Sequence, residues 1–222
     1  MSILEIKKGI YNVGVEDWNL RNFHGYSTSR GTSYNAYLII DDKITLIDTV
    51  KKDFSEELLK NISEIVDPEK IDYIISNHVE MDHSGAIPCL AEKAKNAIIV
   101  TSDPNGIKGL EAHYGKKLNY MVVKSGEELT IGKRKLVFVA TPMVHWPDNM
   151  VTYCPEEKIL FSNDAFGQHY ASNLKMDYEN NLEVIYEEAK KYYTNIVMPY
   201  GMQTRKALEI VKSLDIDIIA PS

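Results

Sequence analysis

The N-terminal part of the chain consists of short apolar runs separated by polar residues. The runs "IYNVGV", "NAYLII" and "ITLIDTV" follow one another, and the turn-forming "DDK" lies between the second and the third. Short apolar runs joined by a tight polar turn are typical of a hairpin. The pattern therefore predicts that the chain opens as an antiparallel sheet.

After Val50 the spacing of apolar residues becomes helical. In "DFSEELLKNISEIV" one face carries Leu58, Leu59, Ile62 and Ile65, as expected of an amphipathic helix. The chain then reads as strand in "YIIS", helix in "GAIPCLAEKA" and strand in "AIIVTS". This order predicts an alternating α/β segment.

A second group of strands and two further helices complete the chain. The segments "EELTIGKRKLVFVAT" and "VTYCPEEKILFSND" read as hairpins, "NLEVIYEEAKKYY" and "TRKALEIVKSL" as helices, and "DIIA" as a last strand. Strands, helices, strands and helices in this order favour two sheets packed face to face with helices outside. No repeat or linker divides the chain, so residues 1–222 are predicted to form one domain.

Composition and charge restrict the class of protein. The chain has 222 residues, 44% of them hydrophobic, and a formal net charge of -7, which disfavours nucleic acid as a partner. No signal peptide or 18-residue apolar stretch occurs, so we expect a cytoplasmic protein without a membrane partner. Cys89 and Cys154 form no C-x-x-C pair and are expected to be reduced packing residues.

The segment "NHVEMDHSGAIP" concentrates metal-binding residue types directly after the apolar run "IDYIIS". His78 and Glu80 are two residues apart in extended backbone and therefore project to the same side. Asp82 and His83 then fall at the start of a helix. Ligands at the carboxyl end of a strand are typical of functional sites in α/β sheets, and this set favours two ions over one. The alternative is a polar loop with a helix cap at Asp82.

Two more candidate ligands follow later strands. His145 comes after "KLVFVAT" and Asp164 after "KILF". A carboxylate has two oxygens that can serve separate cations, which makes Asp164 the natural bridge, and His145 would complete one shell. Alternatively, His145 packs beside Trp146, and Asp164 is a turn or cap residue.

These residues resemble the flavodiiron protein family, also called A-type flavoproteins. The matching blocks are "YSTSRGTSYNAYLI", "LIDT", "NHVEMDHSG", "TPMVHWPDNM", "LFSNDAFGQH" and "IIAPS", which run through the whole chain. The resemblance is to the family's N-terminal metallo-β-lactamase-like domain, and it implies an αββα four-layer sandwich.

The resemblance also implies a site. Two iron ions, bridged by an oxo or hydroxo group, would reduce dioxygen to water or nitric oxide to nitrous oxide. His78, Glu80 and His145 would bind one iron, Asp82 the other, and Asp164 would bridge them. The family leaves open whether His83 coordinates.

Glu80 distinguishes the diiron reductase that the resemblance implies from a hydrolase of the same fold. Hydrolases that share the fold carry H-x-H-x-D-H and usually bind zinc, whereas here Glu80 replaces the second histidine. Anionic oxygen donors suit iron that changes between ferrous and ferric states, although ligand type alone does not exclude zinc or manganese. A dinuclear zinc hydrolase remains the alternative function. A metal-free binding module would leave the clustered ligands unexplained.

The resemblance implies several partners outside these residues. The family's last ligand is a histidine just beyond "IAPS", and its C-terminal flavodoxin-like domain binds FMN, so we expect the chain to be cut from a longer protein. Rubredoxin or a reduced deazaflavin would donate electrons. A head-to-tail homodimer, or a dimer of dimers, would bring the partner's FMN close to the irons.

Other polar residues are candidates for supporting roles. His24 and Tyr193 align with a histidine and a tyrosine that line the substrate pocket in relatives, with packing roles as the alternative. Asp48 is expected to orient loops through backbone hydrogen bonds. His113 and His169 are expected to be non-ligands.

Overall fold

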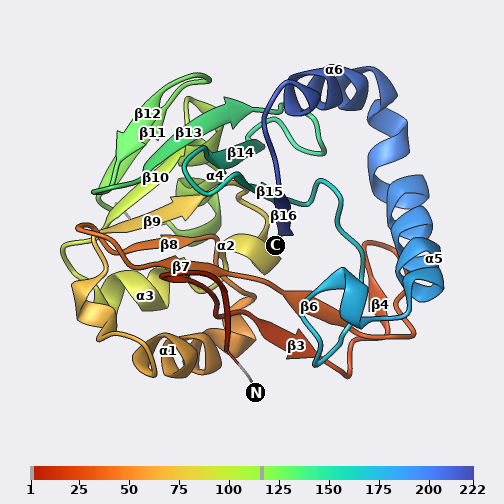
Figure 1. The fold of residues 1–222 in the computed structure, drawn as a ribbon, viewed down its shortest axis with the longest axis horizontal. Coiled ribbons are helices and arrows are strands. Elements are labelled where there is room, and N and C mark those ends of the chain that lie inside the picture. Colours follow the sequence, from red (N-terminus) through yellow and green to blue (C-terminus); the bar gives the residue numbers. More distant parts are fainter. Residues whose placement is uncertain (1–2, 116–117) are drawn as a thin grey trace.

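The larger sheet has seven strands in the order β1-β2-β7-β8-β9-β10-β11, and Figure 1 labels the part of it from β7 to β11. The structure is a computed structural model that describes residues 3–115 and 118–222. The seven strands are β1 (Leu4–Lys7), β2 (Ile10–Asn12), β7 (Tyr37–Ile39), β8 (Thr45–Ile47), β9 (Tyr73–Ser76), β10 (Ile98–Ser102) and β11 (Tyr120–Val123). Strands β7 and β8 pair antiparallel across the "DDK" turn, which confirms the predicted hairpin.

Strands β8 to β11 are parallel, and the connections between them carry helices. These helices are α1 (Ser55–Ser63), α2 (Met81–Ser84), α3 (Ile87–Lys93) and α4 (Asn105–Tyr114). Parallel neighbours need such crossovers, since a tight turn cannot join them. Leu58, Leu59 and Ile62 of α1 are buried against the sheet, as their spacing predicts.

The second sheet has five strands in the order β12-β13-β14-β15-β16. They are β12 (Glu128–Thr130), β13 (Lys135–Ala140), β14 (Met150–Cys154), β15 (Ile159–Asn163) and β16 (Ile218–Pro221). Between β15 and β16 the chain forms α5 (Leu182–Tyr192), a π-helical turn (Tyr193–Val197) and α6 (Gly201–Lys212). Strand β16 then pairs parallel with β15.

Smaller elements complete the described part of the chain. Two small sheets pair β3 (Val15–Asp17) with β6 (Thr32–Tyr34), and β4 (Asn22–Phe23) with β5 (Tyr26–Ser27). Single 3-10 turns span Lys52–Phe54, Pro68–Lys70, Asp177–Glu179 and Met198–Tyr200. No helix in the described ranges combines the length and apolar character needed to cross a bilayer.

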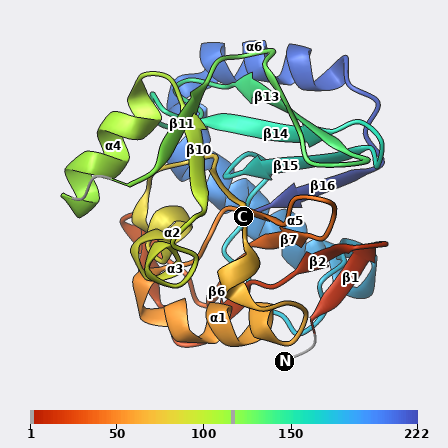
Figure 2. The ribbon, with the colours of Figure 1, turned by 90° about the vertical axis from the view of Figure 1, so that its left-hand side faces the viewer.

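Alternate residues of the strands face different layers, because successive side chains of a strand point to opposite sides. In β9, Ile74 packs with the cluster that contains α1 and α3, whereas Ile75 packs between the two sheets with Phe138 of β13. Val139, the residue after Phe138 in β13, faces outward and packs with Val211 of α6. The molecule therefore has helix, sheet, sheet and helix layers (Figure 2), which confirms the predicted four-layer sandwich.

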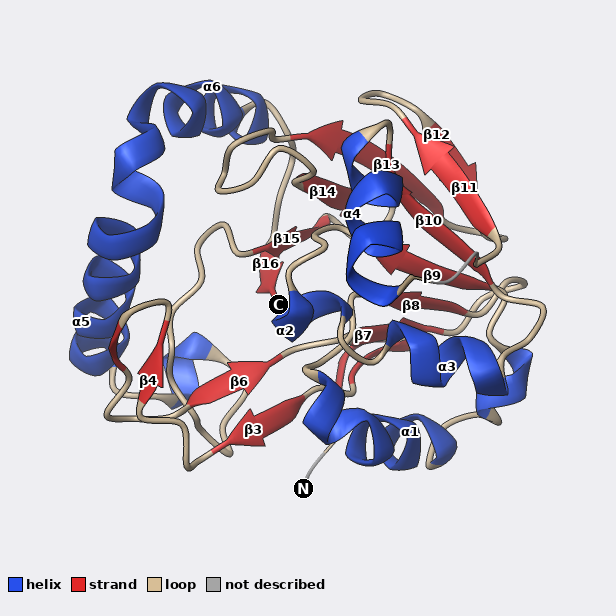
Figure 3. Cartoon of the chain, turned by 180° about the vertical axis from the view of Figure 1, so that it is seen from behind, coloured by secondary structure: helices blue, strands red, loops and turns tan. Residues whose placement is uncertain are grey.

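Helix α4, labelled in Figure 3, is not predicted by the hydrophobic pattern, because its sequence contains Gly106 and Gly109, which weaken helix propensity. Gly109 is needed for packing, since a Cβ atom there would lie 2.8 Å from Val79 Cγ2. The helix backbone can therefore approach the loop between β9 and α2. The glycines of α4 thus weaken its helix propensity but allow it to pack closely against that loop.

The two cysteines lie apart in the core. Cys154 is buried between the sheets, Cys89 is half-buried beside the α1 and α3 cluster, and both are free. Their predicted role as packing residues is confirmed.

Candidate metal centre

Four metal-binding side chains converge near the ends of three strands. His78 and Glu80 follow β9, His145 lies in the loop after β13, and Asp164 directly follows β15. One possible ligand atom from each residue lies within 4.8 Å of all the others. The cluster therefore combines residues carried by both sheets.

The donor atoms of this cluster are spaced like a metal coordination shell. His78 Nε2 lies 3.3 Å from Glu80 Oε2 and from Asp164 Oδ2, and His145 Nε2 lies 3.2 Å from the same two oxygens. Tetrahedral ligands about 2.1 Å from one cation are roughly 3.4 Å apart. His145 Nε2 and Asp164 Oδ2 are buried and have no hydrogen-bond partner among the described residues, which is unusual for buried polar atoms. Both observations fit a bound cation.

Asp82 and His83 lie on the other side of Asp164. His83 Nε2 is 3.1 Å from Asp164 Oδ1 and 3.5 Å from Asp82 Oδ2. Asp82 is buried, and its Oδ1 has no hydrogen-bond partner among the described residues. Asp164 thus directs one oxygen to each group of ligands, an arrangement suited to a carboxylate that bridges two cations.

The orientation of His78 is set by a residue that the sequence analysis did not single out. Asp148 is buried, and its Oδ2 lies 2.9 Å from His78 Nδ1 and 2.8 Å from the backbone nitrogen of Val79. A carboxylate accepts hydrogen bonds, so Nδ1 keeps its proton, and Nε2 is the nitrogen that would bind a cation in the cluster. The sequence did contain a signal for Asp148, which lies three residues after the candidate ligand His145. A metal-bound histidine usually has a carboxylate as partner of its other ring nitrogen, and Asp148 was available for that role.

Asp48 holds the strand end that leads into the ligand loop. Its two carboxylate oxygens accept hydrogen bonds from the backbone nitrogen of Asn77 at 2.8 Å and from Asn77 Nδ2 at 3.0 Å. The Ser222 hydroxyl donates to the same carboxylate at 2.7 Å. The predicted role of Asp48 as a loop-orienting residue is confirmed.

The cluster carries a strong negative field. Burial lowers the pKa of His78 and His145, but the close carboxylates outweigh it, raising the pKa of His78 to about 10 and that of His145 to about 9. Burial raises the pKa of Asp164, but the adjacent histidines hold it well below its usual range. Burial also raises the pKa of Asp82, and there it prevails over the charge of His83. Protons on the histidines thus occupy the electrostatic place that a cation would take.

His24 contacts the cluster, and of the two adjacent tyrosines it is Tyr192 that does so as well. His24 Nε2 lies 3.1 Å from Glu80 Oε1. Tyr193 is 47% exposed, while its neighbour Tyr192 is 3% exposed and its hydroxyl donates to Asp164 Oδ1 at 2.6 Å. Successive helical residues point about 100° apart, so only one of the two tyrosines can face the core here. In this structure Tyr192, rather than Tyr193, contacts the ligand cluster.

The two histidines expected to be non-ligands lie outside the four-residue cluster. His113 stacks on Trp146 with ring centroids 6.4 Å apart. His169 is buried, and its Nε2 lies 3.3 Å from His24 Nδ1. His169 therefore adjoins the site through His24, a contact that the sequence analysis missed.

The comparisons with known proteins agree with this geometry. The family described as "ODP family beta lactamase" matches residues 32–222. Nitric oxide reductase of Moorella thermoacetica is 47% identical over 222 residues, which cover 98% of this chain and 55% of that protein. Rubredoxin-oxygen oxidoreductase of Megalodesulfovibrio gigas is 46% identical over 211 residues, which cover 94% of this chain and 52% of that protein.

A solved structure extends the agreement to the whole fold. The crystal structure of the flavodiiron protein from Giardia intestinalis has a TM-score of 0.96 and 40% identity to this chain, covering 100% of this chain and 54% of that one. The chain spans about half the length of the curated relatives it matches. Because the family match covers most of the chain and the fold agrees over its full length, this chain belongs to the ODP β-lactamase family and is a domain of the flavodiiron type.

Proposed function

We propose that this domain holds two iron ions and, within the complete protein, reduces dioxygen to water or nitric oxide to nitrous oxide. The observation that carries the proposal is the pairing of two carboxylates, Glu80 and Asp164, with two imidazoles in one ring of donor atoms. Mixed imidazole and carboxylate sets suit non-haem iron. The names of the relatives, nitric oxide reductase and rubredoxin-oxygen oxidoreductase, support the same activities.

The ligands divide naturally between two ions. His78, Glu80 and His145 would hold the first, Asp82 the second, and Asp164 would contact both. His83 is close enough to Asp164 to serve either as a ligand or as a hydrogen-bond donor to that carboxylate. Ferrous ions held by these residues would supply electrons to the diatomic substrate.

The protein's own contribution is to orient these ligands and to set their charge. Asp148 keeps the lone pair of His78 directed into the cluster. Glu80 adds a negative charge, which weakens the polarisation of a bound water that hydrolysis needs. The same charge stabilises the oxidised state of iron and so favours electron donation. The charge of Glu80 thus favours reduction over hydrolysis.

Electron delivery belongs to parts of the protein outside these residues. We propose that FMN in a flavodoxin-like domain passes electrons to the irons, and that rubredoxin or a reduced deazaflavin reduces the FMN. A head-to-tail homodimer, or a dimer of such dimers, would place the FMN of one subunit near the irons of its partner. The greater length of the relatives and the word rubredoxin in one relative's name support this arrangement.

The test uses the complete natural protein that contains this chain. Iron and flavin are quantified, and dioxygen and nitric oxide are followed by electrode with reduced rubredoxin or reduced flavin as donor, with ester and lactam hydrolysis measured in parallel. We expect two irons and consumption of at least one gas. Glu80→Gln should abolish turnover, whereas Glu128→Gln, at an exposed position, should not. Hydrolysis by a zinc-loaded form, with no gas consumed by the iron form, would reverse the assignment.

A further inference from the structure

His24 lies at a position that needs support from elsewhere in the fold. It is at the tip of the hairpin β4–β5, which forms a separate two-stranded sheet. Phe23 pairs with Tyr26, so His24 and Gly25 make the turn, with φ values of 49° and 80°. This conformation suits a two-residue hairpin turn, but two strands alone are only marginally stable. The hairpin by itself cannot hold the His24 ring against Glu80.

A buried pair of residues provides a tether for that ring. His169 is 6% exposed and Thr32 is 1% exposed. His169 Nε2 lies 3.3 Å from His24 Nδ1, and His169 Nδ1 lies 2.8 Å from Thr32 Oγ1. The pair therefore joins β6, the loop after β15 and the tip of the hairpin.

The directions of these hydrogen bonds follow from the available protons. The Thr32 hydroxyl donates its one proton to the backbone carbonyl of Ser33 at 3.3 Å, so it accepts the proton of His169 Nδ1. His169 Nε2 is then a lone pair that accepts from His24 Nδ1. Burial and the charge of His24 lower the pKa of His169 to about 3, which keeps this ring neutral. Because Nδ1 of His24 is held by His169, the ring turns its Nε2 edge toward Glu80.

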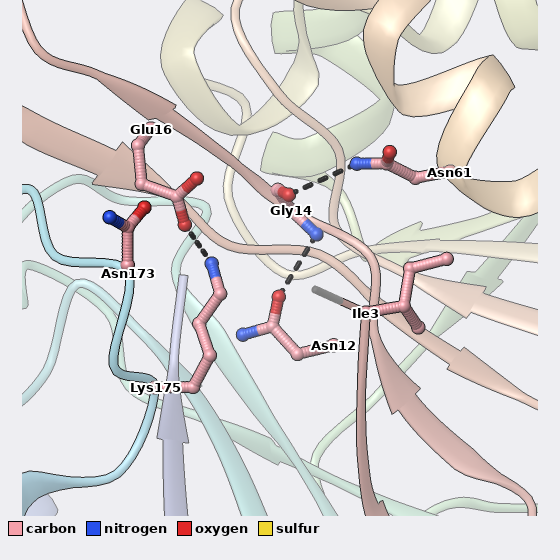
Figure 4. A pocket seen from close by; sticks show the side chains of 7 residues that line it. All are labelled: Ile3, Asn12, Gly14, Glu16, Asn61, Asn173 and Lys175. Carbon is pink, nitrogen blue, oxygen red and sulfur yellow. Dashed lines mark hydrogen bonds and ion pairs between the residues drawn. The ribbon is translucent and has the colours of Figure 1, made fainter. Parts of the chain in front are cut away.

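The loop that carries His169 is itself anchored. The backbone nitrogen of Ala171 donates to the carbonyl of Arg30 at 3.1 Å. Further along, Lys175 forms a largely buried ion pair with Glu16 of β3, as Figure 4 shows. The loop is thus fixed to the segments on both sides of the hairpin β4–β5, and His169 can serve as a rigid support.

We propose that His169 and Thr32 are positioning residues that hold the His24 ring in hydrogen-bonding contact with Glu80, and that they set the rate of diatomic reduction without binding metal. The kinetic part rests on the proposed function. The alternative is that His169 is only a packing ring, since its centroid lies 5.1 Å from that of Phe23 and 5.4 Å from that of Tyr192.

The test compares variants of the complete, iron-loaded protein. Thr32→Val and His169→Phe keep the packing volume but interrupt the hydrogen bonds that connect Thr32, His169 and His24, and they are called the chain-breaking variants. Thr32→Ser and His169→Gln keep a suitable donor or acceptor. Thr28→Val is the matched control, because Thr28 is fully buried and its hydroxyl has no hydrogen-bond partner among the described residues. The two chain-breaking variants should lower kcat by about tenfold at unchanged iron content, and their combination should be no worse than either alone.

A second measurement does not depend on gas turnover. Nitrogen NMR of the zinc-loaded protein should show His169 protonated at Nδ1, and Thr32→Val should change the His24 ring signals whereas Thr28→Val should not. Protonation of His169 at Nε2, or wild-type kcat in both chain-breaking variants, would overturn the positioning role. If the wild-type protein consumed neither gas, the proposed function would fail, while the NMR result would still decide whether the pair positions His24.

Discussion

The Tyr192 hydroxyl donates a 2.6 Å hydrogen bond to Asp164 Oδ1. His83 Nε2 lies 3.1 Å from the same oxygen, whereas Oδ2 faces His78 and His145. The tyrosine therefore fixes the rotation of the one carboxylate that adjoins both groups of ligands.

Replacing Tyr192 by Phe should lower gas turnover by roughly tenfold while both metal ions remain bound, because the ring still packs but one hydrogen bond to a charged group is lost. Turnover and iron content of the complete protein would be measured together. Tyr193→Phe is the control and should behave as wild type, since Tyr193 is 47% exposed. Equal losses in both variants would contradict the assignment of Tyr192.

Asp148→Asn should weaken metal binding by about 10- to 100-fold, because the partner that fixes the tautomer of His78 loses its charge. Affinity would be measured by competition with a chelator. Asp215→Asn, whose side chain is 74% exposed, should leave the affinity unchanged. An unaltered affinity in Asp148→Asn would mean that another contact fixes His78.

The metal-free protein should lose stability as the pH rises. The pKa values of His78, about 10, and His145, about 9, lie above their ordinary value of 6.5, so between these limits the folded state binds more protons than the unfolded state. Their contribution is complete below pH 6.5 and is lost as the pH rises through 9 and 10. Urea unfolding at several pH values should show this fall, and His78→Gln should flatten it.

Metal binding should have the opposite dependence on pH, because each bound ion displaces those protons. Affinity for zinc should therefore increase over the same window in which the metal-free protein becomes less stable. A zinc affinity that is constant from pH 6.5 to 9 would show that the histidines are not protonated in the metal-free state.

Gly109→Ala should destabilise the fold by about 1–3 kcal/mol, because the new methyl group would press on Val79 in the ligand loop. Metal affinity should fall with it. Gly201→Ala is the control, since a Cβ there meets no atom within 4 Å, and it should raise stability by about 0.4–1 kcal/mol. Chemical unfolding of both variants gives the comparison, and equal stabilities would refute the packing argument.

The sequence was most informative where candidate metal ligands follow the ends of predicted strands. His78, Glu80, His145 and Asp164 come after apolar strands or in the loops that follow them, so their meeting at one edge follows from the order of elements. Asp48 could be placed because it directly follows the apolar strand β8.

Other features depend on rotation and on distant packing, which a sequence pattern does not specify. Tyr192 and Tyr193 are adjacent and chemically alike, and only the direction of α5 against the core decides between them. His169 reaches His24 from a loop 145 positions away, with no periodic pattern to mark it. Helix α4 was obscured because the glycines that permit its close packing are poor helix formers.

The ligand cluster also has a consequence for how the molecule is assembled. His78 and Glu80 come from the half of the chain that builds the larger sheet, and His145 and Asp164 from the half that builds the smaller one. Neither half alone holds this set of ligands, so a bound ion would connect the two halves. Chelation should therefore weaken the packing between the two sheets before it disturbs either sheet. The stable association of the two halves of the chain would then depend on the supply of metal.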